Sequence, residues 1–201
     1  MPNKKGRKPL TPEKTAERRE SIVRAANKLF AENGYENISI RRLADEINMS
    51  HMSIYKFFKN KRTILIHLWE EIFQTLFTKC RNAADRGCNP AQQIKNYANC
   101  FVNYWIANPQ NYLMVYGQID MPSRSESFFA DSPLILEELD FLSQLLIQAD
   151  VAPQKVEICC QQYLCALHGI CHSIITIPEL QWQAPSALVE GLVQGIIDQN
   201  K

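Results

Sequence analysis

The 201-residue chain lacks the patterns that mark several large classes of protein. No apolar run approaches the roughly 20 residues that a membrane-spanning helix needs. The basic N-terminus is not followed by the apolar stretch of a secretory signal, so we expect a cytoplasmic protein with no membrane partner. A glycine-rich phosphate loop, a nucleophile elbow and an HExxH motif are also absent. We therefore predict that the chain is not an enzyme and has no catalytic residues.

The seven cysteines lack the paired CxxC spacing of strong metal sites. Their odd number, in a chain without a secretory signal, argues against structural disulfides. One predicted helix places Cys165, His168 and His172 on one face with Cys171 beside it, and these groups suit zinc or copper. A single helix rarely closes four ligands, so we favour ordinary packing and expect no metal and no cofactor. Redox sensing through Cys159 or Cys160 is a further alternative.

The net charge of +1 conceals a strong asymmetry along the chain. Residues 1–62 carry 15 Lys and Arg against 7 Asp and Glu, whereas residues 63–201 carry 7 against 14. A basic N-terminal part on an acidic remainder indicates that one end meets a polyanion such as nucleic acid. Chance segregation of solvated charge is the alternative explanation.

Residues 1–15 are predicted to form a flexible basic arm, because they offer almost nothing that could be buried. Its basic residues are Lys4, Lys5, Arg7 and Lys8. Such an arm either enters a DNA minor groove or stays a solubilising tail. Within it, Thr11-Pro12-Glu13 is typical of a helix start: a capping residue, a proline and an acid.

Residues 16–62 are predicted to form a helix-turn-helix domain. A first helix with a one-sided apolar stripe ends at Asn33-Gly34. Ser39 and Ser50 are typical caps of two short helices joined by a tight turn. The third helix is expected from Ser50 to about Phe58, and the second helix of such a unit can enter the major groove.

Residues 63–201 are predicted to form a second, helical domain. A long helix is expected at 61–86, and no convincing strand pattern appears, so the fold class is all-α. Proline-marked boundaries predict the later helices. They are expected at 91–107, 109–119, 133–149, 153–177 and 185–199. The last two are apolar on more than one side and need several neighbours, which a homodimer interface would supply.

The N-terminal pattern resembles the DNA-binding domain of the TetR family (TetR/AcrR-like regulators). The resemblance runs over about 55 residues, from Ile22 to Lys61, and includes Gly34-Tyr35, the Ser39 cap and the aromatic pair Phe57-Phe58. It implies a dimeric transcriptional regulator, most often a repressor, that binds a near-palindromic double-stranded DNA operator. The pair Met52-Ser53 departs from the small residue that many members carry, so the operator sequence stays open.

The resemblance also implies which residues of this domain meet DNA. Tyr55 and Lys61 are expected to bind phosphates, with Ser39 near another. The residues around Ser50 are expected to meet bases or backbone. The predicted DNA-binding set is completed by Arg41, Arg42, Ser50, His51, Met52, Ser53 and Lys56.

The resemblance further implies that the helical C-terminal part binds a small molecule and that the protein releases the DNA when it does so. An apolar or aromatic effector is expected. Aromatic residues at helical spacing are usually core, but in a sensing domain they also line cavities. The candidate ligand-binding residues are Phe101, Tyr104, Trp105, Tyr112, Tyr116, Phe141 and His168. The segment 166–169 resembles the Trp-His-Gly region of one TetR subgroup, with leucine in place of tryptophan. A helical protein-interaction module, or a metal or redox sensor, is the alternative function.

Overall fold

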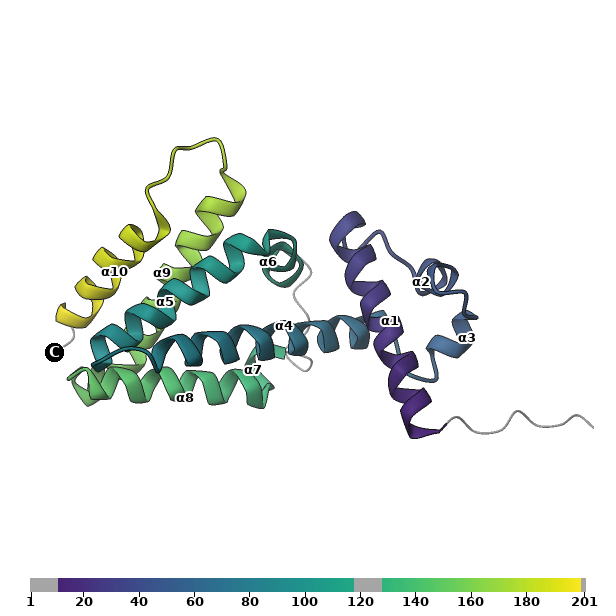
Figure 1. Ribbon diagram of the computed structural model, residues 1–201, viewed down its shortest axis with the longest axis horizontal. Helices are drawn as coiled ribbons and strands as arrows, with labels where there is room; N and C mark the ends of the chain where they lie inside the picture. The colour runs from purple at the N-terminus through teal and green to yellow at the C-terminus, as the bar shows by residue number, and fades with distance from the viewer. Residues whose placement is uncertain (1–10, 118–127, 200–201) are drawn as a thin grey trace, which may run out of the picture. The chain divides into compact units, whose positions relative to one another are not determined.

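The computed structural model describes residues 11–117 and 128–199, and every regular element in those ranges is a helix (Figure 1). The predicted all-α class is confirmed. The chain divides into two compact units, Met1–Trp69 and Glu70–Lys201, which we call the head and the body. Helix α4 (Lys61–Ala84) contributes residues to both units. The division falls after the predicted boundary at 62–63. The first turns of α4, which bury Ile64 and Leu68, belong to the head.

Helix α1 (Pro12–Asn33) opens the head. It begins where the Thr11-Pro12-Glu13 signal predicted, since the Thr11 hydroxyl accepts the Lys14 N–H at 3.4 Å. Residues 12–15 therefore belong to the helix rather than to the predicted arm. At the other end Gly34 has φ 79°, a left-handed conformation that glycine adopts without strain, and its N–H bonds the Phe30 carbonyl at 2.9 Å.

Helices α2 (Ile40–Glu46) and α3 (His51–Ile54) complete the helix-turn-helix unit. Ser39 and Ser50 cap them as predicted, accepting the N–H groups of Arg42 at 3.1 Å and Ser53 at 3.2 Å. Helix α3 is shorter than the predicted span to Phe58. After Ile54 the Lys56 and Phe57 N–H groups make i→i+3 bonds, and the Phe58 N–H makes an i→i+4 bond to the Ile54 carbonyl at 3.0 Å. This turn carries Phe58 into the core, where it is 3% exposed.

The body consists of α5 (Pro90–Ala107), α6 (Pro109–Tyr116), α7 (Phe128–Asp131), α8 (Pro133–Gln148), α9 (Val156–Thr176) and α10 (Pro185–Gln199), with most of α4. Helix α5 packs against α8, α9 and α10. Its fully buried Tyr97 and Trp105 form part of the core, and Tyr163 of α9 donates its hydroxyl proton to the Ile94 carbonyl at 2.9 Å.

The predicted helices of the body agree with these bounds within a few residues, because prolines begin α5, α6, α8 and α10. Two details differ. A short 3-10 turn, Pro153–Lys155, precedes α9, and the four-residue α7 was not predicted. The predicted 109–119 helix ends at Tyr116, and residues 118–119 lie outside the described part of the chain.

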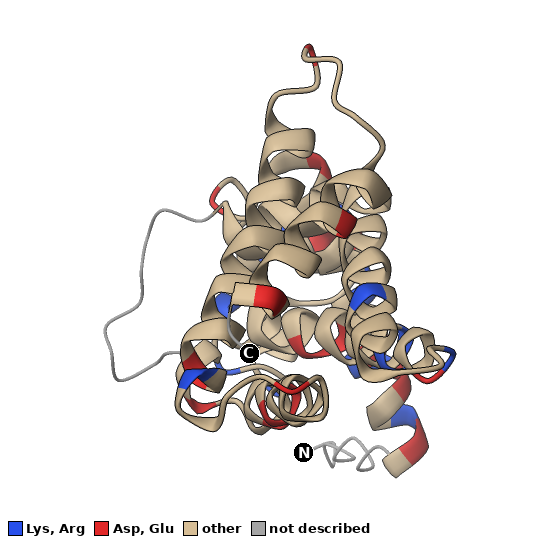
Figure 2. Ribbon diagram, turned by 90° about the vertical axis from the view of Figure 1, so that its left-hand side faces the viewer, with Lys and Arg blue, Asp and Glu red and all other residues tan. Residues whose placement is uncertain are grey.

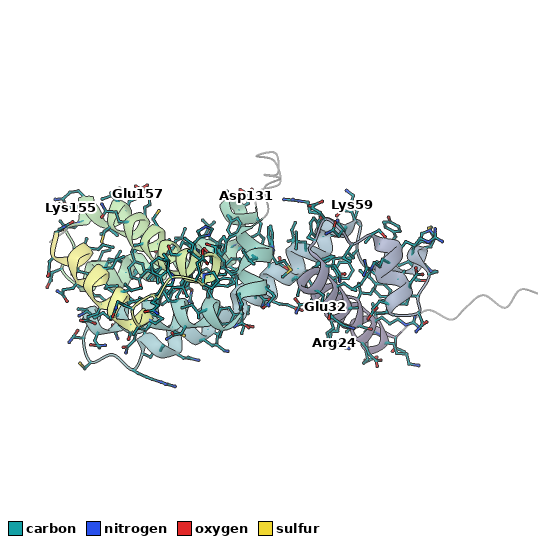
Figure 3. All side chains as sticks on the ribbon, turned by 90° about the horizontal axis from the view of Figure 1, so that it is seen from above. Arg24, Glu32, Lys59, Asp131, Lys155 and Glu157 are labelled. Atoms are coloured by element: carbon teal, nitrogen blue, oxygen red, sulfur yellow. The ribbon has the colours of Figure 1, made fainter. Side chains whose placement is uncertain are left out.

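Charged side chains are concentrated on the outside of each unit. Arg24 and Glu32 of α1, and Lys155 and Glu157 at the start of α9, lie at the periphery when all side chains are drawn (Figure 3). The helices of the body are mostly free of charged positions (Figure 2), and among the described residues Glu138 is the charged residue buried in the core. No helix within the described ranges is long and apolar enough to cross a membrane.

Candidate functional site

The outer face of α3 and the turn after it carries the side chains predicted to meet DNA. His51, Tyr55 and Lys56 are exposed, with Tyr55 at 48%. Met52 is 63% exposed, which places it at the surface rather than in the core and leaves its methyl group available to an apolar partner. On the opposite side of the helix, Ile54 is fully buried in the core and so anchors α3. The face therefore combines hydrogen-bonding, cationic and apolar groups on a support that is firmly packed.

Ser50, the cap of α3, and Ser53 within α3 are hydrogen-bonded to each other. The Ser50 and Ser53 hydroxyl oxygens lie 2.7 Å apart, and the Ser50 oxygen also accepts the Ser53 N–H. Each hydroxyl keeps further hydrogen-bonding capacity. Ser50 is exposed and Ser53 half-buried, so Ser50 is the better placed of the two for an external phosphate or base.

The remaining predicted DNA-binding residues divide into exposed and internally bonded groups. Ser39 and Arg41 are exposed at the start of α2. Arg42 donates to the Asn33 side chain at 3.0 Å. The Lys61 ammonium donates to the Tyr35 carbonyl at 2.9 Å and lies 3.9 Å from the centre of the Tyr35 ring. Lys61 thus fastens the loop after α1 to the start of α4. Lys4, Lys5, Arg7 and Lys8 lie outside the described residues.

Arg19 of α1 contacts the turn after α3 and was not among the site residues predicted from the sequence. Its guanidinium lies 4.5 Å from the centre of the Phe58 ring and donates to the Phe57 carbonyl at 3.5 Å. The contact joins α1 to the end of the helix-turn-helix unit. It depends on residues 38 positions apart, so no local pattern could have indicated it.

The body contains a cavity of about 140 Å³. Its lining is mainly aromatic and aliphatic, and the residues that carry polar groups are one glutamate, one histidine and two tyrosines. The lining residues are Phe73, Phe77, Tyr97, Phe101, Tyr116, Phe129, Ile135, Glu138, Leu139, Leu142, Leu164 and His168. An apolar cavity with few polar groups is the usual form of a small-molecule site.

Glu138 of α8 is the centre of a polar triad at this cavity. One carboxylate oxygen accepts the Tyr97 hydroxyl at 2.7 Å, and the other accepts the Arg81 guanidinium at 2.7 Å. Burial raises the pKa of Glu138 more than the hydrogen bonds from Tyr97 and Arg81 lower it. The triad joins α4, α5 and α8 around one carboxylate, and so fixes one wall of the cavity.

His168 of α9 lines the cavity as well. Its ring lies 4.6 Å from the ring centre of Tyr116 and 5.3 Å from that of Phe101, both edge-to-face. Burial lowers the pKa of His168 to about 4, so the imidazole is neutral at pH 7 and has one donor and one acceptor nitrogen. A neutral imidazole among aromatic rings suits an uncharged ligand with a hydrogen-bonding group.

Of the seven residues predicted to bind ligand, Phe101, Tyr116 and His168 line the cavity. Trp105 and Tyr112 do not line the cavity but contact Tyr116, which does. Their own ring centres lie 5.5 Å apart. The remaining two, Tyr104 and Phe141, lie elsewhere. Tyr104 faces Lys79 at 5.5 Å, and Phe141 faces Arg81 at 5.0 Å and Tyr97 at 6.2 Å.

The contribution of α4 and α8 to the cavity was not predicted from the sequence. Phe73 and Phe77, four residues apart on α4, were available as a signal but were assigned to the long connecting helix. Glu138 falls in phase with Leu142 and Leu145 on the buried stripe of α8, so a carboxylate at a core position could have been noticed. Phe129 belongs to the short α7, for which no local pattern was found.

The side chains of Cys165, His168, Cys171 and His172 on α9 do not come together at one site. Cys165 and His172 are exposed, whereas Cys171 is fully buried. Among the residues that the structure describes, no group of three or more His, Cys, Asp or Glu is placed to hold a metal ion. Burial raises the pKa of Cys159 to about 11 and also raises that of Cys160, so neither thiol is activated toward oxidation.

Residues 22–68 match the family described as bacterial regulatory proteins, tetR family. The chain is 35% identical over 75 residues to the uncharacterized HTH-type transcriptional regulator YhgD of Bacillus subtilis (strain 168), covering 37% of each protein. It is 26% identical over 86 residues to the HTH-type transcriptional repressor KstR2 of Mycolicibacterium smegmatis, covering 43% of this chain and 42% of KstR2. These matches span less than half the length of either relative.

The fold extends the similarity beyond the head. The transcriptional regulator FadR of Bacillus subtilis, solved in complex with stearoyl-CoA, matches with a TM-score of 0.70 at 16% identity, covering 89% of this chain and 97% of FadR. At that identity the match concerns the fold alone. Residues 22–68 of the head, with their capped helix-turn-helix unit, are thus similar to the tetR family of bacterial regulatory proteins, and the chain shares the fold of FadR.

Proposed function

We propose that the protein is a dimeric repressor that binds a near-palindromic DNA operator through the head and releases it when the body binds a small aromatic or apolar molecule. The observation that carries the proposal is the pairing of an exposed, basic helix-turn-helix face with an aromatic cavity in the second unit. The cytoplasmic location expected from the sequence fits this role.

The head has the composition that DNA binding needs. Tyr55 and Lys56 stand next to each other on the exposed face and suit phosphate contacts, while His51 and Met52 lie near the N-terminal end of α3, which enters the groove first in this motif. One α3 of this length offers few base contacts. Two copies on two half-sites would supply the affinity that a specific site requires at cellular salt.

The cavity narrows the class of effector. A volume of about 140 Å³ is below the several hundred Å³ of sites for drug-sized ligands. It suits a molecule of about one ring, as an apolar cavity of similar volume is known to hold benzene. FadR of Bacillus subtilis was solved with stearoyl-CoA. A long acyl chain would require this cavity to expand, so we favour a small, uncharged aromatic compound with one hydrogen-bonding group that meets His168.

The dimer is proposed to form through α9 and α10. Ile158 of α9 is 49% exposed, and added side-chain carbons at Gly169, Gly191 and Gly195 would meet no atom within 4 Å. These open positions would let a second copy approach closely. Sedimentation analysis of the protein is expected to give a dimer that a bulky substitution, Gly191→Trp, converts to a monomer with unchanged helix content.

Helix α4 is the proposed link between effector and operator. It runs without a break from Lys61, which is bonded to Tyr35 in the head, to Phe73 and Phe77 at the cavity. A ligand that binds more tightly when α4 is in one of two positions would shift the equilibrium toward that position, and the head would move with it. The size of this shift in free energy equals the difference between the ligand's binding free energies for the two positions. An effector that bound tightly without changing operator affinity would contradict this link.

DNA binding is tested with the purified protein and its own upstream DNA at two salt concentrations. The variant Tyr55→Ala/Lys56→Ala is expected to bind about 10- to 100-fold more weakly and with a smaller salt slope, because it loses a phosphate contact and a neighbouring hydrogen bond. Arg86→Ala, which removes one positive charge from the body, serves as the matched control and should bind like the parent.

The outcomes separate the proposal from a helical protein-interaction module. Salt-sensitive, sequence-selective binding that only the head variant loses would support a regulator. Equal binding of the parent and the head variant to selected and random DNA would contradict it. The effector class is then tested by a thermal-shift screen of small aromatic compounds, with Leu142→Trp as a variant that fills the cavity.

A further inference from the structure

We propose that Arg19 of α1 is a further DNA-binding residue, which binds a backbone phosphate beside the contact of Tyr55 and Lys56 while its guanidinium rests on the Phe58 ring. The inference rests on the proposed function, because it extends the DNA-binding face of the head from α3 onto α1. No residue of α1 was among those expected from the sequence to meet DNA.

The guanidinium of Arg19 is held at the end of the helix-turn-helix unit by two contacts. Its carbon lies 4.5 Å from the centre of the Phe58 ring, and one of its N–H groups donates to the Phe57 carbonyl at 3.5 Å. Phe57 directly follows Lys56 in the turn after α3. Arg19 therefore brings a positive charge from α1 to within one residue of the exposed pair Tyr55-Lys56.

The groups that hold the guanidinium are buried, whereas Arg19 itself is exposed. Phe58 is 3% exposed, and Ile22, one turn after Arg19 on α1, is fully buried. A guanidinium over the face of a ring is attracted to that face, and a side chain held in this way loses less freedom when it binds a partner. The charge of Arg19 is therefore both accessible to DNA and preorganised.

Most of the hydrogen-bonding capacity of Arg19 is not used within the protein. A guanidinium carries several N–H donors, and one of those of Arg19 is bonded to the Phe57 carbonyl. Across residues 11–117 and 128–199, no carboxylate forms an ion pair with Arg19. The remaining donors form the planar fork that matches two oxygens of a phosphate.

Arg24, five residues further along the same helix, provides a contrast. It is also exposed, but its guanidinium pairs with the Glu20 carboxylate at 3.3 Å. Arg24 and Lys59 lie on opposite sides of the head (Figure 3), and Lys59 directly follows Phe58. Arg24 is therefore a neutralised cation that lies away from the turn which Arg19 contacts.

The turn after α3 thus has exposed cations on two sides of its sequence and a third that comes from α1. These are Lys56, Lys59 and Arg19. Phosphates would relieve the repulsion between these charges, and each phosphate contact releases a counterion from the DNA. Because a phosphate carries no sequence information, Arg19 should add affinity for any duplex rather than discrimination between sequences.

The test measures the affinity of the full-length protein for two duplexes of equal length at several salt concentrations. One duplex is the sequence that the parent selects from random DNA, and the other is a random sequence. Arg19→Gln is expected to weaken binding to both by a similar factor, about 10-fold per head, and to reduce the slope of log affinity against log salt by about one per head. Arg24→Gln removes the same charge from the same helix and, as the matched control, should bind like the parent.

Arg19→Lys separates a phosphate contact from a purely structural role. The lysine keeps the charge but lacks the planar fork, so it should restore the salt slope of the parent and part of its affinity. Circular dichroism checks that each variant is folded.

Three results would overturn the inference while leaving DNA binding by the head intact. They are an unchanged salt slope in Arg19→Gln, an equal loss of affinity in Arg24→Gln, and a loss confined to the selected duplex, which would mean that Arg19 only positions α3. A parent that shows no salt-sensitive, sequence-selective binding would instead contradict the proposed function, and this inference with it.

Discussion

The head and the body are both helical, yet they place their polar side chains in opposite ways. In the head the groups assigned to function are exposed, as Tyr55 and Lys56 are, and the core behind them is apolar. In the body the groups assigned to function are drawn inward, since Glu138 is buried and His168 half-buried, and the outer faces of α8 and α9 expose aliphatic residues such as Ile147 and Ile158.

This difference is what the two proposed kinds of partner would require. A polyanion is bound at a convex, solvated surface. Cationic side chains there keep most of their hydration, and long-range attraction aids association. A small apolar molecule is held by surrounding it, so its recognition groups must be buried and their desolvation offset by neighbours. Substitutions in the body should therefore cost stability, and substitutions on the head face should cost affinity for DNA.

The largest effect on stability is expected for Phe73→Ala. Phe73 is 2% exposed and its ring contacts five others, among them Phe77, Trp105 and Tyr116. Removing the ring should lower the free energy of unfolding by about 3–5 kcal/mol, measured by urea denaturation. Phe129→Ala, at a position that is 39% exposed, is the control and should cost clearly less. Equal losses would mean that the aromatic cluster is not the core of the body.

A pH-dependent effect is expected from His168. Burial holds its folded-state pKa at about 4, below the 6.5 of the unfolded chain, so the stabilising contribution is complete above pH 6.5 and is lost as the pH falls toward 4. The loss is at most about 3 kcal/mol. His168→Gln should remove this slope from the free energy of unfolding, whereas His172→Gln, at an exposed position of the same helix, should keep it.

A smaller loss is expected for Ser50→Ala in the head. The Ser50 oxygen caps α3 by accepting the Ser53 N–H, and losing such a cap costs about 1 kcal/mol. Thermal unfolding monitored by circular dichroism would detect it. Ser186→Ala, at an exposed site in α10, is the comparison and should leave the unfolding temperature unchanged. A neutral Ser50→Ala would show that the cap does not stabilise the head.

The smallest effect on stability is expected for Met52→Ala, within about 0.5 kcal/mol, because a side chain that is 63% exposed loses little packing. The same change is expected to alter the preference for thymine at one operator position, because an exposed methionine methyl can contact a thymine methyl in the major groove. Selection from random DNA with parent and variant measures that preference. Destabilisation together with an unchanged preference would place Met52 in the core and break the contrast between the two units.

The local parts of this fold were predictable from the sequence. The caps Thr11, Ser39 and Ser50 and the left-handed Gly34 act within four residues of themselves, so their sequence signals correspond directly to structure. The predicted length of α3 was wrong, because the helix ends at Ile54. The path of the following turn is set by the packing of Phe58 in the core, which no local signal reveals. The basic arm at Lys4, Lys5, Arg7 and Lys8 stays a prediction.

The cavity was predictable only in part. Phe101, Tyr116 and His168 were found because aromatic residues and an isolated histidine stand out on apolar helices. Tyr104 and Phe141 have the same appearance in sequence, but they face other groups in the body. Helical periodicity gives the face of a residue, not the neighbour that the face meets.

The sequence by itself determined where most helices begin and end, which unit is basic and which motif the head contains, because capping, periodicity and charge are properties of short segments. Only the tertiary structure decided that Arg81 of α4 and Tyr97 of α5 bind the carboxylate of Glu138 of α8. These partners are separated by 16 to 57 positions in the chain. Their meeting depends on how α4, α5 and α8 pack, which is a balance of many weak contacts that no single segment encodes.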